Sequence, residues 1–291
     1  MKFQTIILGE PSLDINTDYT GTVIREVGGA VVAAAYAASG LGHKVAVLPK
    51  AAADIDAHAL FAEAENVTVF PLSSATNTSI SNVYHTADRE RRTCHALSRV
   101  EPYRVDEIPA IEADVWHIAG LIYGDFDESV IRHVASQGKA AVDVQCLLRR
   151  DEGGEMVFRD WPQKKEVFPC IHYLKTDAAE AEILTGLSDR VAAAKQLYDW
   201  GAKEIMITHH SEVLIYDGEE IYTQPIKARN LTGRTGRGDT CFSGYINERQ
   251  SCGIPEALRT AAALVSLKME TPGPFKGCRA DVMAYIQEFY T

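Results

Sequence analysis

The chain contains the segment Thr232-Gly-Arg-Thr-Gly-Arg-Gly-Asp239-Thr-Cys-Phe-Ser-Gly244, in which a glycine-rich turn runs into a helical pattern that begins at Asp239. Such a turn at the start of a helix leaves backbone N–H groups without partners, and these groups attract anions such as phosphate. Arg234 and Arg237 add positive charge to the turn. Because a carboxylate repels phosphate, Asp239 is better explained as a base for a hydroxyl that attacks the phosphate. An ordinary glycine-rich loop is the alternative interpretation.

The composition is that of a globular protein and argues against some classes of partner. The chain has 291 residues, enough for one large α/β domain. Its net charge of −11 and calculated pI near 5.3 argue against general nucleic-acid binding and against an anionic membrane surface. The six cysteines form no Cys-x-x-Cys pair, and no signal peptide is recognisable before Gly9. We therefore expect a reduced, cytoplasmic protein.

Short β-branched runs alternate with helical patterns, which favours a mostly parallel sheet with helices on both faces. The predicted strands are Thr5–Leu8, Lys44–Leu48, Val115–Ala119, Ala140–Val144, Tyr173–Lys175 and Glu204–Thr208. The predicted helices are Val31–Ser39, Ala57–Glu65, Glu128–Ser136, Ala178–Leu184, Arg190–Trp200, Asp239–Gln250, Glu256–Met269 and Asp281–Phe289. Two hairpins interrupt this alternation, Ser79–His85 with Arg92–His95 and Val213–Tyr216 with Ile221–Gln224.

The turn before Asp239 resembles the signature of a known family. Gly233-Arg-Thr-Gly-Arg-Gly-Asp-Thr-Cys-Phe242 is similar to Asp-Thr-Thr-Gly-Ala-Gly-Asp-Thr-Phe, the second signature of the PfkB (ribokinase-like) carbohydrate kinases. The resemblance implies that Asp239 is the catalytic base. It implies that the amides of Gly236, Arg237 and Gly238 form the anion hole. It also implies one ribokinase-like α/β domain over residues 1–291, with a small β-sheet lid from about residues 12–26 and 76–98.

Other partial matches imply a site for the acceptor. In Gly9-Glu10-Pro-Ser-Leu-Asp14, the aspartate stands where the family binds the sugar, although a turn or helix-cap aspartate is the plain alternative. Gly28 and Gly29 match the first signature, but the family's asparagine falls on Ala33, which cannot hydrogen-bond a sugar. Asp143-Val-Gln145-Cys-Leu-Leu-Arg149 is most similar to the inositol-kinase branch. The implied substrate-binding residues are Asp14, Gly28, Gly29, Gln145 and Arg149.

The resemblance also implies a site for ATP and Mg²⁺. Lys175-Thr-Asp177-Ala-Ala-Glu180 stands where the family has Asn-x-x-Glu, although Asp177 and Glu180 also make a capping box by themselves. In Thr208-His-His210-Ser-Glu-Val213, two residues replace the glycines that admit the nucleotide. The implied ATP and magnesium residues are Asp177, Glu180, Thr208 and Arg234, with no side chain bound directly to the metal. The family's aspartate for a monovalent cation falls on Gly233, which leaves a potassium requirement open.

Together these patterns predict an ATP-dependent kinase that phosphorylates a hydroxyl of a sugar or cyclic polyol. Two alternatives stay open: a nucleoside kinase on the same scaffold, and a non-catalytic relative that binds sugar or nucleotide. The expected partners are the small-molecule substrate and ATP, with no nucleic acid and no membrane. The resemblance further suggests a homodimer formed through the lid.

Overall fold

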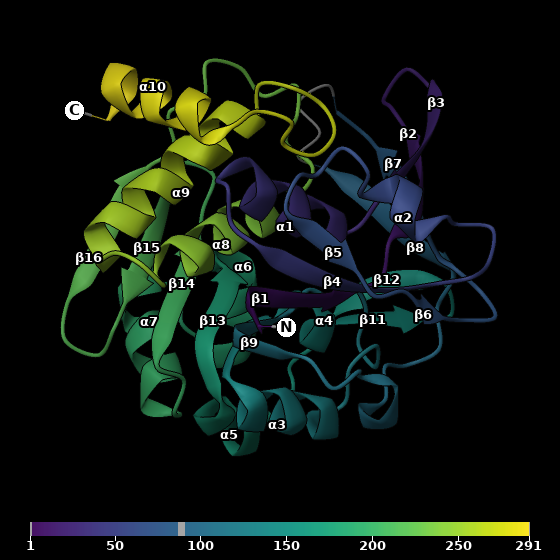
Figure 1. Cartoon of the computed structure of the whole chain (residues 1–291), viewed down its shortest axis with the longest axis horizontal. Helices are drawn as coiled ribbons and strands as arrows, with labels where there is room; N and C mark the ends of the chain where they lie inside the picture. Colours follow the sequence, from purple (N-terminus) through teal and green to yellow (C-terminus); the bar gives the residue numbers. More distant parts are fainter. Residues whose placement is uncertain (1, 87–90, 291) are drawn as a thin grey trace.

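The computed structural model describes residues 2–86 and 91–290, and its central feature is a mostly parallel sheet (Figure 1). Within these residues the sheet has ten strands in the order β16-β15-β14-β13-β10-β9-β1-β4-β5, with β6 beside β4. Only β15 and β16, the second predicted hairpin, run antiparallel to their neighbours. The strands are β1 (Lys2–Gly9), β4 (Val45–Ala51), β5 (Val67–Val69), β6 (Leu72–Ser73), β9 (Glu112–Ile118), β10 (Lys139–Asp143), β13 (Ile171–Asp177), β14 (Glu204–Thr208), β15 (Glu212–Tyr216) and β16 (Ile221–Pro225).

Helices cover both faces of this sheet, as a continuous apolar strand such as β14 requires. On one face, α1, α8 and α9 pack against apolar side chains of the sheet. On the other face lie α3, α6 and α7, and α10 packs on the outside of α9. The helices are α1 (Ala30–Gly40), α2 (Ala57–Leu60), α3 (Glu128–Gln137), α4 (Gln145–Leu148), α5 (Lys164–Val167), α6 (Ala178–Thr185), α7 (Arg190–Asp199), α8 (Arg237–Glu248), α9 (Ile254–Lys268) and α10 (Arg279–Phe289).

A second, smaller sheet lies beside the main one, where a lid was predicted (Figure 1). Among the described residues it has six strands in the order β11-β12-β8-β7-β2-β3. Four of them fall in the predicted segments: β2 (Ser12–Thr17), β3 (Val23–Gly28), β7 (Thr78–Tyr84) and β8 (Arg92–Ser98). The other two, β11 (Arg149–Glu152) and β12 (Glu155–Phe158), were not predicted, because their polar residues show no strand alternation. The turn of the first hairpin includes residues 87–90, which lie outside the described residues.

The helix that carries the glycine-rich signature begins two residues earlier than predicted. Gly236 is its N-cap, with a φ of 76° that favours glycine, and α8 starts at Arg237. Asp239 is therefore the third residue of the first helical turn, not the residue at which the helix begins. The amides at this end consequently belong to the helix itself.

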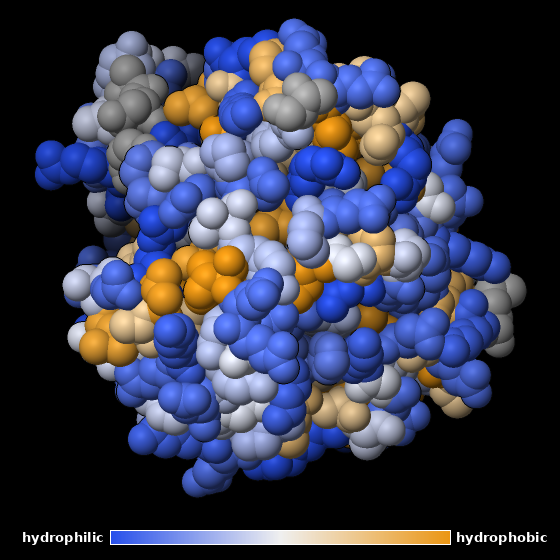
Figure 2. All heavy atoms as spheres, turned by 90° about the vertical axis from the view of Figure 1, so that its left-hand side faces the viewer, coloured by the Kyte–Doolittle hydropathy of each residue, from blue (hydrophilic) through white to orange (hydrophobic). Residues whose placement is uncertain are grey.

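The face of the molecule drawn in Figure 2 is mostly hydrophilic, in keeping with the ordinary composition. Figure 2 shows charged and polar residues over most of one face, with apolar side chains gathered in small groups. No helix in the described ranges has the length and apolarity that crossing a bilayer would require.

Candidate active site between the main sheet and the small sheet

A cavity of about 410 Å³ opens between the small sheet and the carboxyl edge of the main sheet. Ligands of open parallel sheets bind at this edge. Twelve of the thirteen predicted site residues line the cavity. They are Asp14, Gly29, Gln145, Arg149, Asp177, Glu180, Thr208, Arg234, Gly236, Arg237, Gly238 and Asp239. The fold thus brings together segments that are up to 225 positions apart in the chain, from Asp14 to Asp239.

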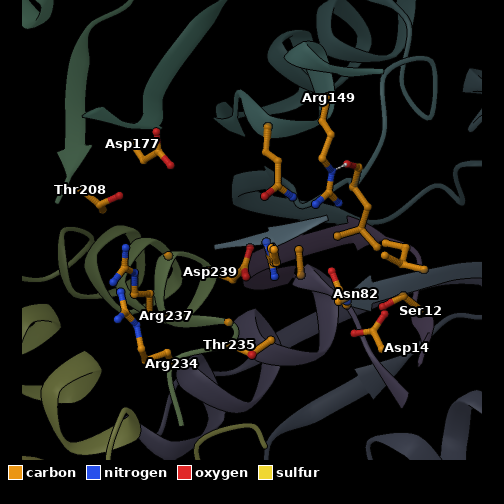
Figure 3. Close-up of a pocket in the computed structure, with 18 of the residues that line it drawn as sticks. Ser12, Asp14, Asn82, Arg149, Asp177, Thr208, Arg234, Thr235, Arg237 and Asp239 are labelled. Carbon is orange, nitrogen blue, oxygen red and sulfur yellow. Dashed lines mark hydrogen bonds between the residues drawn. The ribbon is translucent and has the colours of Figure 1, made fainter. Parts of the chain in front are cut away.

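The cavity has two chemically different ends, and Asp239 lies between them (Figure 3). Ser12, Asp14 and Asn82 form one end, which we call the lid end because these residues come from strands of the small sheet. The arginine end consists of Asp177, Thr208, Arg234 and Arg237. An acid at this central position can reach ligands bound at both ends.

The turn before α8 has the geometry of an anion site. Gly236 and Gly238 have backbone N–H groups with no acceptor among the described residues. The predicted third donor, the amide of Arg237, instead donates to the carbonyl of Arg234 over 3.3 Å. Two free amides and the positive end of the helix dipole therefore face the cavity.

The surroundings of Asp239 favour its action as a base. Burial raises the pKa of Asp239, the nearby carboxylate of Asp143 raises it further, and Lys175 opposes the rise. A carboxylate with a raised pKa is a stronger proton acceptor than an exposed aspartate. The geometry and the direction of the pKa shift therefore agree with the predicted role.

Lys175 is a buried cation at the centre of the site that the sequence interpretation missed. Its ammonium lies 2.8 Å from a carboxylate oxygen of Asp143 and 4.0 Å from one of Glu180. Although burial lowers the pKa of Lys175, the surrounding carboxylates, led by Asp143, raise it overall, so the group is charged. A Cβ atom at Gly238 would lie only 3.1 Å from this ammonium, so a side chain there would crowd Lys175. A lysine directly after the apolar residues Tyr173 and Leu174 was the available signal in the sequence.

Asp177 and Glu180 form the capping box that the sequence allowed. The Asp177 carboxylate accepts from the amide of Glu180, and the Glu180 carboxylate accepts from the amide of Asp177, both over 2.8 Å. Burial raises the pKa of Glu180 to about 8, despite the opposing charge of Lys175. The cap holds both carboxylates at the cavity wall, so a structural role and a binding role are compatible.

Asp14 is the principal polar group of the lid end. Its Oδ1 atom is buried and has no hydrogen-bond partner within the described residues. Burial raises the pKa of Asp14 to about 6, although a hydrogen bond with Ser12 opposes the rise. A buried carboxylate oxygen without a partner is costly unless a ligand supplies one. This observation favours a hydroxyl-bearing ligand at the lid end.

Arg149 and Gln145 complete the cavity wall beside the lid end. The Arg149 Nε donates to the carbonyl of Leu121 over 2.8 Å, and the Leu121 amide donates to a carboxylate oxygen of Glu10 over 2.9 Å. Burial lowers the pKa of Arg149, and the charge of Arg92 adds to that effect. Glu10, from the first predicted motif, therefore acts on the site through the chain segment at Leu121.

Gly28 is the one predicted site residue that does not line the cavity. A Cβ atom there would lie 2.9 Å from the Asp14 carboxylate, so Gly28 makes room for Asp14. Gly29 lines the cavity with a φ of 109°, and a Cβ atom there would lie 2.6 Å from the carbonyl of Glu10. The Cβ atom of Ala33 lies 3.2 Å from the point where a Cβ atom of Gly236 would be. The alanine therefore lies against the glycine-rich turn before α8.

Several polar lining residues were not assigned to the site from the sequence, although Ser12 and Lys175 lie within motifs quoted above. They are Ser12, Asn82, Tyr84, Arg92 and Lys175. The first four lie on the small sheet, and along β7 every second side chain is buried, Asn82 and Tyr84 among them. The sequence predicted a strand here, but not which of its residues face the cavity.

Comparisons with known proteins find relatives that match nearly the whole chain. The model of the family described as "pfkB family carbohydrate kinase" matches residues 9–278. The solved structure of a pyrophosphate-dependent kinase in the ribokinase family, complexed with a pyrophosphate analog and myo-inositol, is 32% identical, covers 97% of this chain and 100% of its own, and has a TM-score of 0.88. A sulfate complex of a pyrophosphate-dependent kinase in that family is 33% identical over 97% of this chain and 100% of its own, with a TM-score of 0.89.

A curated relative widens the range of acceptors. The cytidine kinase of Thermococcus kodakarensis is 26% identical over 259 residues, which are 83% of this chain and 86% of that protein. All of these relatives are kinases that phosphorylate hydroxyl groups, and this chain is likewise a phosphotransferase with a small-molecule acceptor and a phosphate donor. The predicted ribokinase-like fold is confirmed. The chain belongs to the pfkB family of carbohydrate kinases.

Proposed function

We propose that this kinase transfers a phosphoryl group from pyrophosphate to a hydroxyl of an inositol-like cyclic polyol. Asp239 would take the proton of that hydroxyl, and the amides of Gly236 and Gly238 would stabilise the charge on the transferring group. The observation that carries the proposal is the position of Asp239 between an end suited to hydroxyls and an end suited to phosphate.

The composition of the arginine end supports pyrophosphate over the ATP expected from the sequence. Thr208, Asp177 and the two arginines line this end, and none of them offers an apolar surface for a base. Base-binding pockets are predominantly apolar or aromatic. Residues 271–274 of the described structure, which include Pro272 and Pro274, do not line the cavity. The pyrophosphate-dependent relatives are consistent with this choice of donor.

The lid end supports a polyol as the acceptor. Ser12, Asp14 and Asn82 face the cavity, together with Gln145 and Arg149. Five polar side chains around one small space suit a ring that carries a hydroxyl on most of its carbons. The relative solved with myo-inositol supports the same class of acceptor.

Asp177 at the arginine end and the adjoining Glu180 also fit a magnesium ion. Magnesium usually keeps several waters and binds through one or two carboxylates and the substrate phosphates. Asp177 and Glu180 sit at the cavity wall and are fixed by their mutual hydrogen bonds, so they would hold the waters of such an ion. When bound, magnesium supplies charge neutralisation to the phosphates.

A donor and acceptor panel tests the proposal. The purified chain would be assayed with pyrophosphate or ATP against myo-inositol, ribose, fructose, adenosine and cytidine, with products identified by phosphorus NMR. We expect the highest kcat/KM with pyrophosphate and an inositol. Turnover with ATP and none with pyrophosphate would contradict the proposed donor. The second candidate, a nucleoside kinase, is favoured by the cytidine kinase relative and predicts that cytidine or adenosine is the preferred acceptor.

A further inference from the structure

Lys268, the last residue of α9, is a buried cation that is absent from the cavity wall. The residue is only 1% exposed. Its ammonium donates to the carbonyl of Gly233 over 2.6 Å and also to the carbonyl of Thr235. The described part of the chain places no carboxylate within 4.0 Å of this ammonium. Burial lowers the pKa of Lys268 to about 8, while the charges of Asp239 and Glu26 oppose that fall, so the ammonium is mainly charged at neutral pH. Keeping this charge buried without a carboxylate in contact is costly.

The two carbonyls that bind Lys268 belong to the turn that presents the anion-binding amides. Gly233 and Thr235 directly precede the N-cap of α8, and the Cβ position of Gly236 lies 4.0 Å from the Lys268 ammonium. Carbonyl groups directed at one point repel each other unless a cation lies between them. Neutralising them fixes the peptide planes that orient the following amides.

The same turn is attached to the end of α9 by backbone contacts that leave no space for a side chain. The Gly233 amide donates to the carbonyl of Met269 over 2.8 Å. A Cβ atom at Gly233 would lie 1.8 Å from the carbonyl oxygen of Thr271. An aspartate at position 233 therefore cannot be accommodated, and the only positive charge that the described structure places against these carbonyls is that of Lys268.

We infer that Lys268 is a positioning residue whose tethered ammonium orders the Gly233–Gly236 turn and takes the place of a free monovalent cation. It touches neither the donor nor the acceptor, and it acts through the carbonyls of the turn. The inference rests on the proposed function, in which the amides of this turn bind the transferring phosphoryl group.

The test compares Lys268→Met and Lys268→Ala with Lys276→Met, which removes an exposed lysine paired with Glu63. Turnover would be measured at constant ionic strength in potassium, ethylammonium or tetramethylammonium chloride. We expect wild-type and Lys276→Met turnover to be the same in all three salts. The kcat of the Lys268 variants should fall about 100-fold or more, as it does when one hydrogen-bond donor of an oxyanion hole is removed. Ethylammonium or potassium should restore part of the activity of Lys268→Ala, and tetramethylammonium should not.

Two results would overturn the inference: a wild-type enzyme that potassium stimulates several-fold, or a Lys268→Met variant with wild-type kcat. If the variants do not fold, as judged by circular dichroism, the salt dependence of the wild type decides alone. If no donor and acceptor pair gives turnover, the proposed function fails. Titration calorimetry with pyrophosphate then tests Lys268 separately. We expect at least 10-fold weaker binding by Lys268→Met than by Lys276→Met, and equal affinities would refute the role.

Discussion

At the scale of single residues, the site depends on buried charges that oppose one another. Lys175 lies against Asp143, and both act on the pKa of Asp239 in opposite directions. The raised pKa shows that the carboxylates and burial outweigh the lysine. A carboxylate whose pKa is raised by burial destabilises the folded state when it is ionised.

The first prediction at this scale concerns Asp239→Asn. The amide cannot accept the proton, so kcat should fall by about 100- to 10,000-fold. The same change removes a buried charge, so the melting temperature should rise. Steady-state kinetics and calorimetric melting check both effects, and pyrophosphate affinity serves as the control because it should persist. A variant with unchanged turnover would show that Asp239 is not the base.

The second prediction concerns Asp14 and pH. Because burial raises the pKa of Asp14 to about 6, the carboxylate is protonated below that pH and accepts fewer hydrogen bonds from hydroxyls. The KM for the acceptor should therefore rise as the pH falls through about 6. Asp14→Asn should have a high KM at every pH and no such inflection.

Stability gives an independent measurement of the same group. The folded pKa of Asp14 lies above its ordinary value, so the folded state binds the proton more tightly than the unfolded state. Protonated Asp14 therefore adds to the free energy of unfolding at a pH below the pKa that it has in the unfolded chain. This contribution is lost as the pH rises through about 6. Above pH 6, Asp14→Asn should thus have a larger free energy of unfolding than wild type in urea. A smaller value would contradict the raised pKa.

At the scale of elements, two helices begin at the cavity. The N-cap of α1 is Gly29 and that of α8 is Gly236, and both glycines line the cavity. The two helices pack together, and the Ser243 hydroxyl of α8 donates to the carbonyl of Ala34 in α1 over 2.7 Å. The pair therefore directs two positive helix ends at the same space.

The prediction at this scale is that Gly29→Ala disrupts the start of α1. The added Cβ atom would lie 2.6 Å from the carbonyl oxygen of Glu10. The alanine would also have to adopt the φ of 109° that Gly29 has. We expect a loss of roughly 3 kcal/mol or more in the free energy of unfolding. Gly42→Ala is the matched control, because Gly42 has a φ of 80° and no atom within 4 Å of its Cβ position. It should cost about 1–2 kcal/mol, and equal losses in urea titrations would show that the contact with Glu10 is unimportant.

At the scale of the whole molecule, the cavity lies between the small sheet and the main sheet, so a ligand that fills it would contact both. The lid end comes from the small sheet and the arginine end from the main sheet and α8. A ligand that binds the folded state at 100 times its dissociation constant should stabilise it by about 2.7 kcal/mol.

We therefore predict that pyrophosphate raises the melting temperature and that ATP at the same concentration gives a smaller rise. Differential scanning fluorimetry, with and without myo-inositol, measures both effects. The matched control is the double variant Arg234→Met, Arg237→Met, which should lose most of the pyrophosphate effect. A larger shift with ATP than with pyrophosphate would favour the nucleotide as donor.

The fold and most of the site were predictable because local patterns carry them. The alternation of strand and helix patterns predicted the parallel sheet, and the two interruptions in it predicted the hairpins. The pattern Gly236-Arg-Gly-Asp239 predicted the position of Asp239. Strands β11 and β12 were missed because polar residues in short strands show no periodicity. Gly28 and Gly29 were both predicted to bind substrate, and only Gly29 lines the cavity, since a sequence match does not say which of two adjacent glycines faces it.

The sequence by itself determined the family of the chain, the acid at the end of an anion-binding turn, and the segments that meet around it. Only the tertiary structure decided that Lys175 and Lys268 are buried beside that turn and that the arginine end is without an apolar surface. The physical reason is sequence separation: Lys268 meets the turn from 33 to 35 positions away, and Lys175 meets Asp143 from the neighbouring strand. Charges that lie so far apart in the sequence meet only when the helices and strands pack together, and local sequence patterns do not encode that packing.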